Sequence, residues 1–227
     1  GLSPTGRSAG GGWRLGANGA AQFARAGTHR GGGLEGTRRG GRLFSGVGAR
    51  AWLHDFLFSR FEVVRFDAEG FTREFLGARD TVEYLATGDL TSSMSLALGA
   101  DWTEERAELD GDDYDASNAA VFAELKATPV EALELSLTLR YDDYSDFDGQ
   151  LSGRAALSYQ LNDATLVRAS LGTGYRAPSL YERFGPYAGS TPLDPEDSLS
   201  FDLGVEHSYG DRGSVKATLF WAEIDNL

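Results

Sequence analysis

The chain has 227 residues, with 34 Asp and Glu against 21 Lys and Arg, a formal net charge of -13 and no Cys. The negative charge argues against binding to nucleic-acid phosphates, and the absence of thiols excludes disulfide scaffolds, thiolate zinc centres, iron–sulfur clusters and Cys nucleophiles. Because no run of about 18 apolar residues exists, the sequence predicts no transmembrane helix and leaves a soluble β protein or a membrane β-barrel.

The first 50 residues differ in composition from the rest of the chain. They hold 16 of the 30 Gly, and residues 1–60 carry nine Arg but only two acidic residues. Gly-rich backbone loses much conformational entropy on folding and offers little apolar surface to bury. We therefore expect residues 1–50 to be a poorly defined segment with at most one weak strand near 13–23, and residues 51–227 to form the folded part. A flexible nucleic-acid-binding arm is the alternative for the first segment.

From residue 52 onward, apolar and polar residues alternate with a period of two, which is typical of strands. The clearest segment is 133–142, where four Leu and Tyr141 share one face and polar residues share the other. The same alternation marks further segments: 93–102, 151–160, 166–175, 199–209 and 215–221. Residues 52–66, 81–88 and 119–127 fit the pattern less regularly. The sequence therefore predicts an all-β chain.

Two features favour a membrane barrel over a soluble β-sandwich. The segments run about 9–11 residues, the length of a tilted membrane-crossing strand. Aromatic residues stand at the strand ends on the apolar face, where amphipathic rings settle at the boundary between lipid and water. These residues are Trp102, Tyr141, Tyr159, Tyr175, Tyr209 and Trp221. The opposite face is polar and partly charged, as a wet or plugged barrel interior requires.

The connections between the predicted strands alternate in length. Short ones are expected at 88–92, 128–132, 161–164 and 210–213, and longer ones at 103–117, 143–150 and 176–198. Outer-membrane barrels have short periplasmic turns and longer outer loops. The alternation therefore places the three longer connections outside the cell and the short turns in the periplasm.

Residues 172–206 carry a set of motifs typical of one family. Residues 174–182 read GYRAPSLYE, residues 191–196 read TPLDPE, and residues 204–206 read GVE. These runs resemble signature segments of TonB-dependent outer-membrane receptors, with Thr191 standing where the family usually has Asn. The resemblance is strong over 120–227, fair over 72–119 and absent over 1–50. Within the family, receptors for vitamin B12 and iron siderophores are the most similar.

The resemblance implies an antiparallel transmembrane β-barrel of about 22 strands. The sequence supplies about eight to ten of them, without the family's plug or its aromatic-ended last strand, so we expect a fragment of the barrel. The family's function implies an outer-membrane receptor that takes up a scarce ligand such as cobalamin or a ferric siderophore, and not an enzyme. The implied partners are outer-membrane lipid, the small-molecule ligand and the TonB energy-coupling complex. A passive porin-like or structural barrel is the alternative.

The longest predicted loop supplies the candidate ligand contacts. Aromatic rings with a few charges suit a large ligand that is partly apolar and partly polar. The candidates are Arg176, Tyr181, Arg183 and Tyr187. A structural role is the alternative, and it is favoured for Arg176, Pro178 and Pro195, which would fix the path of the loop and pack on the plug. For Tyr181 and Tyr187 the two interpretations stay open.

The predicted connection 103–117 is rich in carboxylates, which are the ligands that Ca²⁺ prefers. The candidate ligands are Asp110, Asp112, Asp113 and Asp115. Their spacing is not that of an EF-hand, but some cobalamin receptors of the family order their loops with calcium. A solvated acidic loop is the alternative. Calcium is the only cofactor that the sequence suggests.

Overall fold

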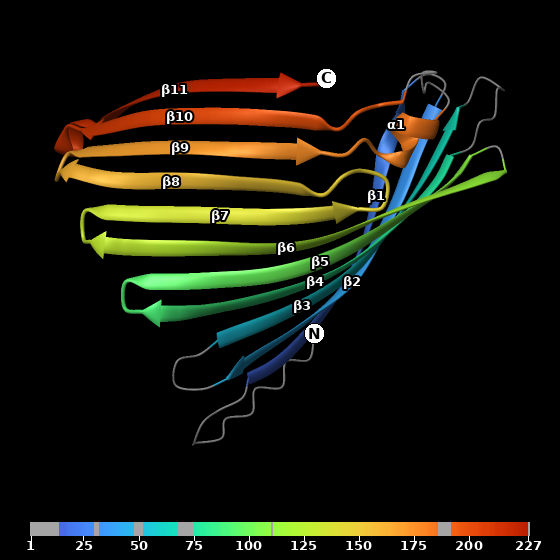
Figure 1. Cartoon of the computed structure of the whole chain (residues 1–227), viewed down its shortest axis with the longest axis horizontal. Helices are drawn as coiled ribbons and strands as arrows, with labels where there is room; N and C mark the ends of the chain where they lie inside the picture. Colours follow the sequence, from blue (N-terminus) through green and yellow to red (C-terminus); the bar gives the residue numbers. More distant parts are fainter. Residues whose placement is uncertain are drawn as a thin grey trace.

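The computed structural model describes residues 14–29, 32–47, 52–67, 75–109, 111–185 and 192–226. Within them, side chains are described for residues 52–64, 75–109, 111–185 and 192–226. The described residues form a single sheet of 11 antiparallel strands, each paired with its neighbours in chain order. Figure 1 shows this sheet twisting and curving as a section of a barrel wall does. The expected all-β antiparallel barrel fragment is confirmed.

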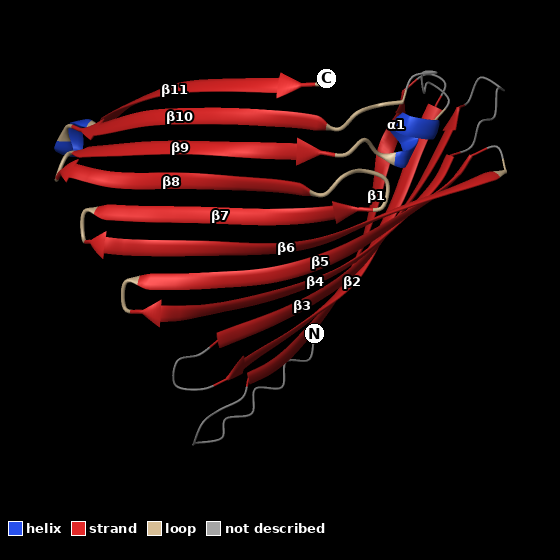
Figure 2. Ribbon diagram, viewed as in Figure 1, coloured by secondary structure: helices blue, strands red, loops and turns tan. Residues whose placement is uncertain are grey.

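The strands are long and follow one another as hairpins. They are β1 Arg14–His29, β2 Gly32–Val47, β3 Trp52–Asp67, β4 Phe75–Thr91, β5 Met94–Leu109, β6 Asp112–Val130, β7 Leu133–Tyr144, β8 Gln150–Asn162, β9 Thr165–Arg176, β10 Glu196–Ser208 and β11 Ser214–Asp225. A short helix, α1 (Leu180–Phe184), separates β9 from β10, and a 3-10 turn, η1 (Gly210–Arg212), separates β10 from β11 (Figure 2). Among the described residues, no helix is long and apolar enough to cross a bilayer.

The pairing register of the strands aligns the alternating apolar and polar residues, so the sheet has one apolar face and one polar face. Leu137 of β7 lies opposite Leu125 of β6 and Ala155 of β8. Side chains two residues apart share a face, so each apolar series extends into the next strand. Leu135, Leu137 and Leu139 are 40–48% exposed on this face, which we call the outward face. A broad apolar surface of this kind is what a barrel wall presents to lipid.

The opposite face, which we call the inner face, is polar along most of its length. Near the end that carries α1 it becomes apolar, because Leu180 of α1 packs against Phe75, Ala107 and Leu109 of β4 and β5. These four side chains are 3–6% exposed. Residues 177–185, which follow β9 and include α1, therefore fold back onto the inner face and cover one end of it.

The N-terminal part of the sheet corrects the expectation for residues 1–50. Two paired strands, β1 and β2, occupy residues 14–29 and 32–47, where the sequence predicted at most one weak strand. The ladder between antiparallel strands is made by backbone groups, so Gly-rich segments can pair wherever a neighbouring strand supplies a template. Here β3 pairs with β2 along its full length. The sheet therefore has more strands than the eight to ten that alternation alone predicted.

The predicted outer loop 103–117 is also corrected, because most of it is strand. β5 continues to Leu109, and β6 begins at Asp112 directly opposite. The acidic residues obscured a period of two that persists on the inner face, where Ala107, Leu109 and Tyr114 pack beneath α1. Burial under α1 explains why the hairpin extends this far.

The remaining connections fall where the sequence placed them. Short turns at residues 92–93, 131–132 and 163–164 lie at one end of the sheet, together with η1 (Figure 1). The longer connections, of which residues 145–149, 177–185 and 192–195 are described, lie at the other end, beside α1. We call this second end the loop end. Its assignment to the cell exterior stays a prediction.

The aromatic residues at the strand ends follow the expected pattern with one exception. Trp102, Tyr141, Tyr159, Tyr209 and Trp221 are all 40–56% exposed. Tyr175 differs, because its ring lies 5.3 Å from that of Tyr144 and its hydroxyl is buried. β9 pairs with β10 as far as Arg176 but with β8 only as far as Gly172, so the end of β9 lacks a paired strand on the β8 side. The prediction that Tyr175 belongs to the boundary aromatics is therefore wrong.

A single pair of substitutions tests which face meets lipid. We expect Leu137→Arg, in the middle of the outward apolar band, to destabilise the barrel by about 2–4 kcal/mol, because a cation is costly at the membrane midplane. Ser136→Arg places the same side chain on the inner face, where a cavity of about 840 Å³ leaves room for it. We expect that variant to cost less than about 1 kcal/mol. The temperature at which the folded form loses its resistance to SDS measures the stability of each variant. Equal loss of stability in the two variants would contradict the assignment of the outward face to lipid.

Candidate functional site

Two adjoining cavities lie on the inner face at the loop end. One, of about 420 Å³, is lined mainly by polar and charged groups from β4 to β7 and from the start of the connection 177–195. The other, of about 340 Å³, is lined mainly by apolar groups from β3, β4, β5 and α1. They share Arg79, Glu105 and Ser179 in their walls. We call the two cavities together the loop-end cleft.

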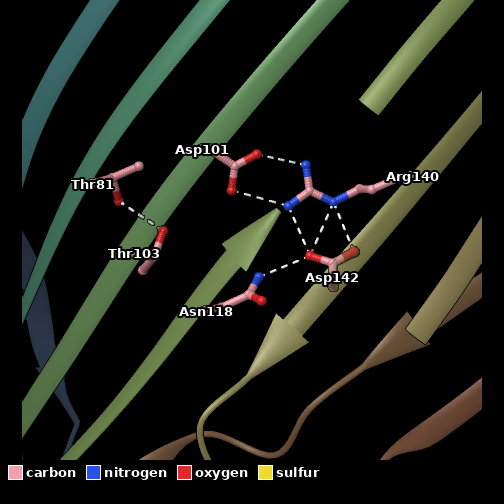
Figure 3. A network of polar contacts seen from close by, with 6 residues as sticks. All are labelled: Thr81, Asp101, Thr103, Asn118, Arg140 and Asp142. Atoms are coloured by element: carbon pink, nitrogen blue, oxygen red, sulfur yellow. Dashed lines mark hydrogen bonds and ion pairs between the residues drawn. The ribbon is translucent and has the colours of Figure 1, made fainter. Parts of the chain in front are cut away.

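Arg140 of β7 organises the floor of the polar cavity (Figure 3). Its Nη1 donates to Oδ2 of Asp101 at 2.6 Å and its Nη2 to Oδ1 of Asp142 at 2.8 Å. Asn118 donates from Nδ2 to the same Asp142 oxygen at 2.8 Å. These contacts join β5, β6 and β7 through side chains. Asp101 and Asp142 are only 14% and 9% exposed in their side chains, so each needs this cation nearby.

A glycine makes room for the apolar support beneath Arg140. The guanidinium carbon lies 5.7 Å from the centre of the Phe122 ring. That ring lies over Gly99 of β5, where a Cβ atom would come within 2.1 Å of it. A side chain at this position would displace the ring. Phe122 and Gly99 therefore set the height at which the Arg140 guanidinium stands above the sheet.

The local sequence explains why α1 forms and where it begins. Ser179 is its N-cap, and its Oγ accepts a hydrogen bond from the Glu182 amide at 3.3 Å. The Glu182 carboxylate accepts one in return from the Ser179 amide at 2.8 Å. This reciprocal capping box satisfies two backbone donors that a helix start leaves unpaired. Gly185 ends the helix after one turn and donates its N–H to the Tyr181 carbonyl.

The first predicted ligand contact, Arg176, joins three elements. Its Nη1 donates to Oε1 of Glu196, at the start of β10, at 2.6 Å, and its Nη2 donates to Glu182 of α1. The side chain also lines the polar cavity. This geometry fits the structural interpretation of Arg176, in which it fixes the path of the loop.

The second, Arg183, anchors α1 to the neighbouring connection. It forms an ion pair with Asp146, and its guanidinium lies 5.2 Å from the Phe147 ring centre and 4.8 Å from that of Phe184. The hydrogen bond from Arg183 lowers the pKa of the Asp146 carboxyl, against a smaller opposing effect of burial. Arg183 lines the polar cavity, as Arg176 does.

The structure separates the aromatic candidates from the two arginines. Tyr181 packs edge-on against Phe75 with ring centres 4.8 Å apart, in the wall of the apolar cavity. Tyr187 lies outside the described residues. Sequence reasoning missed Arg79, Asp101 and Arg140 as parts of the site. The positions of Asp101 and Arg140 on the polar faces of predicted strands were visible, but Arg79 precedes the predicted strand 81–88 and the folding of α1 onto that face was not visible.

Three of the four candidate calcium ligands fall on β6. Asp112, Asp113 and Asp115 belong to the strand, so Asp113 shares a face with Asp115 and not with Asp112. No group of three or more His, Asp or Glu among the described residues is arranged to hold a metal ion. Asp110 lies outside those residues, so calcium binding here stays a prediction.

The ion pairs that hold α1 give its docking a defined pH dependence. The hydrogen bond from Arg183 lowers the pKa of Asp146. Burial raises the pKa of Glu182, but hydrogen bonds from Arg176 and Ser179 outweigh burial, so the pKa of Glu182 is lowered as well. A lowered pKa in the folded state means that the stabilisation is present at neutral pH and lost as the pH falls below about 4. We expect Trp fluorescence of a Phe184→Trp variant to shift to longer wavelength over that range. In the same background, Asp146→Asn should shift the spectrum already at neutral pH, and an unchanged spectrum would contradict this account.

Comparison with known proteins decides the family. The sequence model of the family described as TonB dependent receptor-like, beta-barrel, matches residues 4–227. The chain belongs to the TonB-dependent receptor family. The match includes most of residues 1–50, where the motifs had shown no resemblance, and it agrees with the pairing of β1 and β2. The proposed division of the chain near residue 50 stays a prediction.

Individual relatives of this TonB-dependent receptor chain are transporters and receptors. The Vitamin B12 transporter BtuB of Vibrio cholerae serotype O1 is 35% identical over 137 residues, which cover 59% of this chain and 22% of that protein. Among solved structures, the siderophore receptor PirA from Pseudomonas aeruginosa has a TM-score of 0.68 at 17% identity, covering 92% of this chain and 46% of that one. The copper transporter OprC has a TM-score of 0.67, with 93% and 42% covered. The chain thus spans less than half the length of these proteins.

Proposed function

We propose that this chain forms part of the wall of a bacterial outer-membrane receptor that takes up a scarce small molecule with energy supplied through TonB. Lipid covers the outward face, and the ligand enters at the loop end. Arg176, Tyr181, Arg183 and Tyr187 lie on the connection that the ligand meets first. Cobalamin and ferric siderophores are the ligand classes to examine. No bond of the ligand is broken in this role, so no catalytic residue is required.

The observation that carries this proposal is the loop-end cleft. The longest connection folds inward, and α1 with Leu180 and Tyr181 forms part of the cavity wall. A receptor needs concave surface on which to retain a ligand, and the inward fold of α1 provides one. The 35% identity to a vitamin B12 transporter supports an uptake role over a purely structural one.

Uptake in the bacterium that carries the gene tests the proposal. We expect deletion of the gene to remove saturable uptake of radiolabelled cyanocobalamin or of radio-iron bound to a siderophore. Deletion of TonB should have the same effect on that ligand. Re-expression of the gene from a plasmid, with TonB present, is the control. Uptake that needs the gene but not TonB would point instead to a passive barrel, and uptake that needs neither would contradict the proposal.

A further inference from the structure

We infer that the loop-end cleft selects a ligand without negative charge, neutral or cationic, that presents an apolar ring. The inference rests on the proposed function and narrows its substrate class. It depends on how the charges of the cleft are paired and on the composition of its two cavities.

Every guanidinium that the polar cavity presents has a carboxylate partner. Arg140 is bound by Asp101 and Asp142, Arg176 by Glu182 and Glu196, Arg79 by Glu105, and Arg183 by Asp146. The described side chains of these pairs therefore carry more carboxylates than guanidinium groups. A site for a polyanion needs cations whose hydrogen-bond donors are free for the ligand. Here each guanidinium is already neutralised by at least one carboxylate, and an anionic ligand would meet a net negative wall.

The surroundings of the cleft add to this negative charge. Asp148, Asp194 and Asp197 are exposed on the connections at the loop end and at the start of β10. Exposed charges of one sign around an opening steer ligands by their charge, and the effect weakens as salt is added. A cationic ligand is therefore attracted to the opening, and an anionic one is repelled.

The second cavity supplies the apolar requirement. Phe75, Leu180 and Tyr181 form its wall together with Phe61 and Val63. Phe75 and Leu180 are only 6% and 3% exposed, so the ring of Phe61, which is 38% exposed, supplies the accessible aromatic surface of this wall. Because the Arg79–Glu105 pair lies in the walls of both cavities, a ligand that fills both must place its apolar part beside α1 and its polar part over Arg140.

Ligands of different charge test the inference. Outer-membrane vesicles that contain the protein from its own gene are titrated with cyanocobalamin, a neutral ferric trihydroxamate, a cationic ferric trihydroxamate, and a ferric tricatecholate with three negative charges. We expect a neutral or cationic probe to bind at least about tenfold more tightly than the tricatecholate at low salt. Binding of the cationic probe should weaken as salt is added, and that of a neutral probe should not.

Charge variants separate electrostatics from shape. Asp148→Asn with Asp194→Asn removes two exposed carboxylates from the surroundings of the cleft, so we expect tricatecholate binding to strengthen about two- to fivefold at low salt while binding of a neutral probe changes less than twofold. Glu124→Gln is the matched control, because Glu124 pairs with Lys126 and lies outside the cleft.

Three results would overturn the inference: tightest binding by the tricatecholate, no binding of any neutral or cationic probe, or no response to the double substitution. TonB-dependent uptake of a tricatecholate would overturn it while leaving the proposed function standing.

Discussion

The 227-residue polypeptide, produced by itself and mixed with lipid vesicles, is expected not to insert as a folded barrel. Its sheet has two edges, β1 and β11, and β11 pairs only with β10 along its whole length. Backbone N–H and C=O groups along such an edge have no partner in hydrocarbon, and each costs several kcal/mol. Summed over a strand, this penalty is far larger than the stability of an ordinary domain. We therefore expect aggregation, with no band that shifts on heating in SDS gels.

Self-pairing does not rescue the isolated polypeptide. The strands alternate in direction, so with 11 strands β1 and β11 run the same way. Closing the sheet on itself, or with a second copy that points the same way across the membrane, would create parallel junctions that barrels of this type do not use. The matched control is a full-length relative refolded under the same conditions. A protease-resistant, heat-modifiable form of the isolated polypeptide would contradict the expectation.

Removal of the Arg140 side chain is expected to be the most damaging single substitution among the polar groups of the inner face. Arg140→Leu leaves Asp101 and Asp142 as neighbouring carboxylates without their cation, and both are largely buried. Breaking a buried pair by removing one partner costs about 3–5 kcal/mol. We expect a loss of that size in the thermal stability of the folded, SDS-resistant form, measured on the protein from its own gene.

A matched control distinguishes burial from charge. Arg168 also faces a carboxylate, Glu206, but at 3.5 Å and with 58% of its side chain exposed. Exposed pairs contribute about 0–1 kcal/mol, so Arg168→Leu should be nearly neutral. Adding Asp101→Asn and Asp142→Asn to Arg140→Leu removes the uncompensated charges and should restore part of the loss. Equal effects of the Arg140 and Arg168 substitutions would contradict the role given to the network.

The strands that alternate cleanly could be predicted from the sequence because one period fixes both the element and its faces. In β7 the four Leu and Tyr141 define the outward face, and Arg140 and Asp142 define the inner one. Strands β1 and β2 could not be predicted this way, since their Gly-rich residues carry little pattern and depend on β3 for pairing. The length of the predicted strands and their succession along the chain were enough to predict the fold class, although single strands were missed.

The site was only partly predictable, because its geometry depends on contacts between distant segments. Arg176 and Arg183 were found in the longest predicted loop, but Arg140 and Asp101 come together only when β5, β6 and β7 pair. The helix α1 went unpredicted inside an expected loop, although Ser179 and Glu182 have the spacing of a capping box. The acidic residues after Thr103 were interpreted as a loop because the apolar contacts that keep them in strands come from α1.

Labelling along β7 shows directly whether one face of each strand meets lipid and the other meets the barrel interior. The chain has no Cys, so single Cys substitutions at residues 134–139 add one labelling site each to it. Nitroxide labels at these sites, in outer-membrane vesicles, report accessibility to oxygen dissolved in lipid. We expect high accessibility at 135, 137 and 139 and low accessibility at 134, 136 and 138. Uniform accessibility, or a maximum at the even positions, would contradict the claim.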